Sequence, residues 1–148
     1  MAVGEINTAS AVIALSRQIE EDGARFYTAL AELFPEKGEV FLALAKENNR
    51  NVVKIERTYY SVISDALEGC FSFRILPEEY TFKVELKKKA SLSEALGMAV
   101  EMESQVIRFY VQAAEQSKSL LADLPRIFAL IAQKRESRKE RLSSIQTA

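Results

Sequence analysis

Apolar side chains recur every three or four residues along four long stretches of this chain, the period of a helix with one buried face. The last stretch has the most complete pattern. Its buried positions are predicted to be Leu124, Phe128, Ile131, Arg135, Arg138, Leu142 and Ile145. Guanidinium groups stay charged and are costly to bury without carboxylate partners. The pattern therefore predicts acidic side chains inside the fold, facing the two arginines.

The first two helices are predicted to carry polar residues in the middle of their buried faces. The first begins at Asn7 or Thr8, either of which can cap it, and runs to about Leu33. Its buried stripe reads Ile13, Ser16, Glu20, Gly23, Tyr27 and Leu30. The second begins after Pro35 and ends at Gly69. Its stripe reads Phe41, Leu44, Asn48, Asn51/Val52, Ile55, Tyr59, Val62 and Ala66.

The second half of the chain repeats this arrangement after a connecting segment. Between residues 70 and 90, Tyr80, Phe82, Val84 and Leu86 alternate with polar residues, which predicts an extended crossover. Phe71, Phe73 and Ile75 are expected to help it cover the bundle. A capping box over residues 91–94 then starts the third helix, which ends around Lys118, and Asp123 opens the fourth. The third stripe reads Leu96, Ala99, Glu103, Val106, Tyr110 and Ala113.

An internal repeat relates the two halves. Residues 20–27 read EEDGARFY and residues 103–110 read ESQVIRFY, at a constant offset of 83 residues. The pattern predicts one all-α domain over residues 1–148, a ferritin-like four-helix bundle made of two helical hairpins. Hairpin one spans about 7–69, the crossover about 70–90 and hairpin two about 91–146.

These motifs resemble the rubrerythrin branch of the ferritin-like di-iron carboxylate proteins. The Glu-x6-Tyr pairs at Glu20/Tyr27 and Glu103/Tyr110 look like that family's first and third helices. The family's site takes one Glu from each of two helices and a Glu-x-x-His from each of the others. By position, the six sites of the family's ligands hold Glu20, Asn48, Asn51, Glu103, Arg135 and Arg138. Four of the six ligands, both histidines included, are replaced.

These replacements change the chemistry of the core. Arginine has only donors and cannot bind a metal cation, and asparagine offers a weak carbonyl ligand. We therefore expect no cofactor, but a buried network of two glutamates, two arginines and two asparagines, to which Tyr27 or Tyr110 adds a hydroxyl. Two alternatives remain. The arginines could instead reach out to Glu136 or Glu140, or Glu47, Glu101 or Glu136 could rebuild an iron site.

Composition indicates the cellular compartment more clearly than it indicates the function. The chain has a net charge of −1, no histidine and a single cysteine, Cys70, so a disulfide within the chain is excluded. No basic leader or membrane-length apolar run is found, which favours the cytoplasm. Basic residues near the C-terminus (Lys134, Lys139 and Arg141) alternate with glutamates, so we expect no nucleic-acid partner.

The sequence thus favours a non-catalytic structural or interaction module, most simply a homodimer that meets its copy through the crossover or through Tyr60 and Ile63 on the second helix. One alternative is the di-iron oxidase or peroxidase that the resemblance implies, which would need iron and the missing ligands. Another is a binder of a small anion or ligand in the polar core, where Glu20 and Glu103 already neutralise the arginines. Neither a pathway nor a protein partner follows from the residues.

Overall fold

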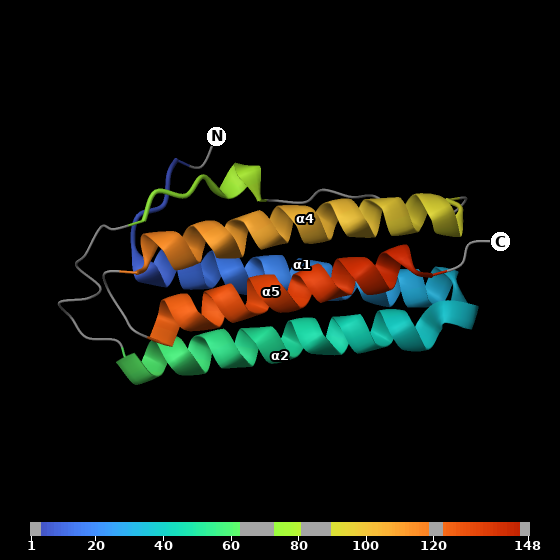
Figure 1. Cartoon of the computed structure of the whole chain (residues 1–148), viewed down its shortest axis with the longest axis horizontal. Coiled ribbons are helices and arrows are strands. Elements are labelled where there is room, and N and C mark those ends of the chain that lie inside the picture. The colour runs from blue at the N-terminus through green and yellow to red at the C-terminus, as the bar shows by residue number, and fades with distance from the viewer. Residues whose placement is uncertain (1–3, 63–72, 81–89, 119–122, 146–148) are drawn as a thin grey trace.

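The computed structural model describes residues 4–62, 73–80, 90–118 and 123–145. Four α-helices within these ranges lie side by side as a bundle (Figure 1). They are α1 (Ala9–Leu33), α2 (Gly38–Val62), α4 (Leu92–Gln116) and α5 (Asp123–Ser143), with short 3-10 turns η1 (Pro35–Lys37) and η2 (Pro77–Glu79). Extended pairing in the described residues is limited to one antiparallel bridge between Ile6 and Ile75. The predicted all-helical class is confirmed.

The helices associate mainly as two antiparallel pairs. α1 packs along α2, and α4 packs along α5, while α2 also contacts α5. The backbones of α1 and α4 approach each other at only a few points. The two pairs therefore meet through α2 and α5 and, between α1 and α4, mainly through side chains.

Capping side chains set the predicted helix starts. Thr8 Oγ1 accepts a hydrogen bond from the Ala11 amide at 3.2 Å, and Ser91 Oγ accepts one from Glu94 at 3.1 Å. α2 starts later than expected. The Lys37 amide bonds to the Phe34 carbonyl at 2.9 Å, so a 3-10 turn precedes the helix. The predicted end of this helix at Gly69 lies outside the described residues.

The described part of the crossover lies against the bundle as expected, but Tyr80 is not extended. Phe73 and Ile75 are fully buried, and the Ile6 and Ile75 amides bond to each other's carbonyls at 2.8 and 3.2 Å. Tyr80 instead closes the 3-10 turn η2, because its amide bonds to the Pro77 carbonyl at 3.0 Å. Phe71 and residues 81–86 of the predicted extended segment lie outside the described residues.

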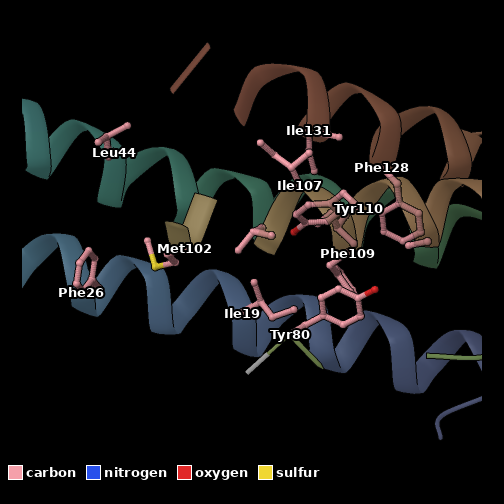
Figure 2. Packing of buried hydrophobic residues seen from close by; sticks show 14 of the residues in the cluster. Ile19, Phe26, Leu44, Tyr80, Met102, Ile107, Phe109, Tyr110, Phe128 and Ile131 are labelled. Atoms are coloured by element: carbon pink, nitrogen blue, oxygen red, sulfur yellow. The ribbon is translucent and has the colours of Figure 1, made fainter. Parts of the chain in front are cut away.

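The core is largely apolar and contains two groups of aromatic rings, of which Phe26, Tyr27 and Phe41 form one. Tyr80, Phe109, Tyr110 and Phe128 form a chain of ring contacts with centroids 5.1 to 5.9 Å apart (Figure 2). The predicted stripe of α5 is buried, except that Ile145 is only partly covered. Within the described ranges, no helix combines the length and the apolar character needed to cross a membrane.

Candidate functional site

Four charged side chains meet in the bundle core. Glu20 of α1 and Glu103 of α4 are fully buried, and Arg135 and Arg138 of α5 are 1% and 2% exposed. Fully buried charges are uncommon in proteins unless they are paired. The predicted burial of these four residues is confirmed, and the alternative in which the arginines reach out to Glu136 or Glu140 is wrong.

A single guanidinium bridges the two carboxylates. Arg135 Nη2 donates to Glu20 Oε1 at 2.6 Å, and Arg135 Nη1 donates to Glu103 Oε1 at 2.7 Å. Charge-assisted hydrogen bonds of this length are among the strongest in proteins. Arg135 thus lies between the glutamates and links α1, α4 and α5 at one point.

Two tyrosines donate hydrogen bonds to the second oxygens of these carboxylates, each to the glutamate of the other helix pair. The Tyr27 hydroxyl of α1 donates to Glu103 Oε2 of α4, and the Tyr110 hydroxyl of α4 donates to Glu20 Oε2 of α1, each at 2.5 Å. Either tyrosine was expected to contribute, and both do. Because α1 and α4 share few backbone contacts, these two bonds connect the helix pairs across the core.

The asparagines contribute less to the carboxylates than predicted. Asn51 Nδ2 reaches Glu20 Oε1 at 3.4 Å, a long hydrogen bond. Asn48 Nδ2 donates to the backbone carbonyl of Glu20 at 3.1 Å and does not bond to either carboxylate. Asn48 therefore joins α2 to the α1 backbone, a role that depends on helix packing and not on side-chain charge.

Gly23 makes room for that contact. A Cβ built on Gly23 would overlap Asn48 Nδ2. We expect Gly23→Ala to displace Asn48 and lower the free energy of unfolding by about 1–3 kcal/mol, through overpacking and a lost hydrogen bond. Gly97→Ala is the matched control, since its Cβ would meet nothing within 4 Å. Urea unfolding should show the control gaining about 0.4–1 kcal/mol; a similar gain for Gly23→Ala would disprove the steric role.

Arg138 is buried but incompletely satisfied. Its Nη2 lies 3.0 Å from Glu103 Oε2, and its Nη1 lies 3.9 Å from Glu47 Oε2. The short ion pair lacks hydrogen-bond geometry, because none of the three guanidinium nitrogens has a hydrogen-bond partner among the described residues. The guanidinium also lies 5.4 Å from the centre of the Tyr27 ring. Arg138 thus keeps unused donors, whereas both terminal nitrogens of Arg135 are bonded.

Glu47 takes a role that the sequence analysis does not predict. Its predicted alternative role is that of a displaced metal ligand, yet its carboxylate lies at the edge of the network. Both of its oxygens accept hydrogen bonds from Arg141, at 3.0 and 3.1 Å, and one lies near Arg138. The i,i+3 spacing of Arg138 and Arg141 on α5 was the available signal.

Glu103 and Arg135 are held in their charged forms at neutral pH. Burial alone would raise the pKa of the Glu103 carboxyl, but the charges of Arg135 and Arg138 outweigh it and lower that pKa. Burial would lower the pKa of Arg135, but Glu103 and Glu20 raise it well above its usual value. Burial raises the pKa of Tyr27 well above its usual value, and the Glu103 charge adds to this. Tyr27 therefore stays a protonated donor.

These residues do not fit a pair of iron ions. Iron binds carboxylate oxygen and imidazole nitrogen, whereas the core here presents guanidinium donors and Arg135 fills the space between the glutamates. Glu101 and Glu136 lie on exposed faces, and Glu47 is paired with Arg141. Within the described residues, no group of three or more Asp, Glu or Cys side chains is placed to hold a metal ion.

The fold and this network define an all-helical bundle with a charge-balanced polar core, two carboxylates against two guanidiniums. Comparison with protein-family models, curated proteins and solved structures finds no match. The function is therefore inferred from the chemistry of the described residues.

Proposed function

We propose that this chain is a non-catalytic bundle of ferritin-like design in which Arg135 and Arg138 take the electrostatic place of metal ions. The observation that carries the proposal is the Arg135 bridge, with hydrogen bonds of 2.6 and 2.7 Å to the two buried glutamates. A guanidinium in that position supplies the positive charge that the carboxylates need. It offers no vacant coordination site and no electron to transfer.

The ionisation of the core also argues against acid–base catalysis. A general acid or base works best with a pKa near the operating pH. Here burial raises the pKa values of Tyr27 and Tyr110, the arginines lower the pKa of Glu103, and the two glutamates raise the pKa of Arg135. Each of these shifts moves a group away from neutral pH. A structural role fits such a site better than proton transfer does.

The crosswise tyrosine bonds support the ferritin-like part of the proposal. Glu20 and Tyr27 of the first helix pair are bonded to Tyr110 and Glu103 of the second, so corresponding residues of the two halves exchange the same contact. The halves then differ at the positions that resemble Glu-x-x-His, with asparagines on α2 and arginines on α5. Loss of metal binding on both helices is a simple account of that difference.

Restoring the ligand pattern tests the proposal. We expect the variant Asn48→Glu/Asn51→His/Arg135→Glu/Arg138→His to bind about two ferrous ions per chain under argon, because it recreates the donor set of the family it resembles. The matched control restores only α2, with Asn48→Glu/Asn51→His, and should bind none because Arg135 remains between the glutamates. Elemental analysis after desalting gives the stoichiometry. A folded quadruple variant without iron would refute the ferritin-like geometry.

We further propose that the module acts as a homodimer through the outer face of α2. Leu42, Val53 and Tyr60 are 50%, 53% and 69% exposed, and their spacings of 11 and 7 residues place them on one side of the helix. Ile63, which the sequence places on this face, lies outside the described residues.

Sedimentation equilibrium distinguishes this dimer from a monomer. We expect twice the 16.6 kDa chain mass for the native protein and the chain mass for Val53→Glu, because a carboxylate would be buried in the interface. Val111→Glu on α4, at an equally exposed position, should remain dimeric. A monomeric native protein would overturn this part of the proposal.

A further inference from the structure

A cationic pocket lies between α2 and α5, beside the buried network. Its volume is about 310 Å³. Charged side chains dominate its lining, with Arg50 and Lys54 from α2 and Lys134, Arg138 and Arg141 from α5, against one carboxylate, Glu47. Arg135 lies at its base, already bonded to Glu20 and Glu103.

The pocket keeps a surplus of positive charge after the buried pairs are counted. Glu20 and Glu103 balance Arg135 and Arg138. Among the residues that line the pocket, the other four cations are accompanied by one carboxylate, Glu47, which leaves a surplus of three positive charges. The whole chain carries a net charge of −1, so this concentration is local. A cleft lined by one sign of charge focuses its potential and attracts ions of the other sign.

Arg138 provides a built receptor in this pocket. It is 2% exposed and lines the pocket, and beyond its ion pair with Glu103 at 3.0 Å none of its guanidinium nitrogens has a hydrogen-bond partner among the described residues. A buried donor without a partner is costly, which is why nearly all such groups are satisfied. The planar guanidinium matches two oxygens of a phosphate or carboxylate group.

Crowding of like charges at the rim supports this picture. The Lys134 side chain beside the Lys54 ammonium lowers the pKa of Lys54, and the charge of Arg50 adds to the effect. A bound anion would relieve the repulsion among these like charges.

We propose that this pocket binds a small phosphate-class oxyanion, with Arg138 at its base and Lys54 and Lys134 at its rim. The volume is at the small end of ligand pockets, which suits one or two phosphate groups better than a whole nucleotide. Glu47 opposes such an anion by its own charge and by holding Arg141. The inference shares Arg138 with the proposed function, but its test uses Lys54, Lys134 and Glu47, which lie outside the four buried charges.

Variants that remove either a positive or a negative charge from the pocket test the proposal, with anion affinity measured by isothermal titration calorimetry at constant ionic strength. With inorganic diphosphate as the probe, we expect Lys134→Gln and Lys54→Gln each to weaken binding by about tenfold, the scale of one charge-assisted hydrogen bond. Glu47→Gln should tighten binding, because it removes the competing carboxylate. Lys118→Gln is the matched control, an exposed lysine outside the pocket, and should leave the affinity unchanged.

Further titrations identify the source of the phosphate group. Tighter binding of glycerol phosphate than of inorganic phosphate would indicate a small organic phosphate ester, and the reverse order the free ion; either supports the proposal. Absence of heat with all three probes at millimolar concentration would overturn it. Equal weakening by Lys118→Gln would overturn it too, as would displacement of diphosphate by a single-stranded oligonucleotide that binds more tightly.

Discussion

Replacing Glu103 by alanine is expected to lower the free energy of unfolding by about 3–5 kcal/mol, the usual cost of leaving a buried charge without its partner. Glu103 accepts a hydrogen bond from Arg135 at 2.7 Å and from Tyr27 at 2.5 Å, and its second oxygen lies 3.0 Å from Arg138. The variant would leave Arg138 with no nearer carboxylate than Glu47, at 3.9 Å. Urea unfolding at neutral pH, followed by circular dichroism, measures the loss.

Glu101→Ala is the matched control for this variant. Glu101 lies on the same helix and is exposed, so its replacement should change stability by no more than about 0.5 kcal/mol. A loss below about 1 kcal/mol for Glu103→Ala, the range of an exposed ion pair, would show that water screens these charges and that the network is not a buried one.

Arg135→Met is expected to lower the free energy of unfolding at neutral pH by a similar amount, about 3–5 kcal/mol, because within the described residues Arg135 alone is bonded to both glutamates. The loss should also depend on pH. In the native protein the pKa of Glu103 is lowered, so its stabilising contribution is present above the unfolded pKa of about 4.3 and is lost as pH falls through the folded pKa. In the variant, burial without the Arg135 guanidinium raises the pKa of Glu103. As pH falls, this carboxyl is then protonated in the folded state before it is protonated in the unfolded state.

The difference in stability between the native protein and Arg135→Met should therefore shrink as pH falls from 7 towards about 4.5. Chemical unfolding at several pH values, with Arg126→Met as an exposed control on the same helix, gives the comparison. A difference that stays constant over this range would mean that the methionine is destabilising through packing alone, and the electrostatic account would fail.

The burial of the charged residues could be predicted because periodicity fixes which side of a helix is covered. Arg135 and Arg138 continue the stripe of Phe128 and Ile131, and the structure buries all four. The starts of α1 and α4 could be predicted as well, since Thr8 and Ser91 are recognisable caps. These features depend on residues within a few positions of one another.

Partner choice inside the core could not be predicted in the same way. The sequence placed Glu20 and Tyr27 on one stripe, but their bonds run to the opposite helix pair. Asn48 faces the core as expected and yet bonds to the α1 backbone, because Gly23 lets it approach. Such contacts depend on how each helix is rotated about its axis and how closely two helices pack. The periodicity of a single helix does not specify either.

The two buried arginines also differ in a way that periodicity does not reveal. They are three residues apart on α5, and both are nearly inaccessible to solvent. Arg135 has both terminal nitrogens bonded to carboxylates, whereas Arg138 has an ion pair without hydrogen-bond geometry and lines a cationic pocket. We therefore assign the first to holding the helices together and the second to recognising an anion.

Metal content tests the central claim, that guanidinium groups have taken the place of metal ions, most directly. The native protein, purified without added metal, would be incubated with ferrous iron under argon, desalted and analysed for iron. We predict no bound iron above the level of a matched helical control protein, since Arg135 holds both glutamates. About two irons per chain would contradict the account, because the carboxylates would then have released the arginine to bind metal.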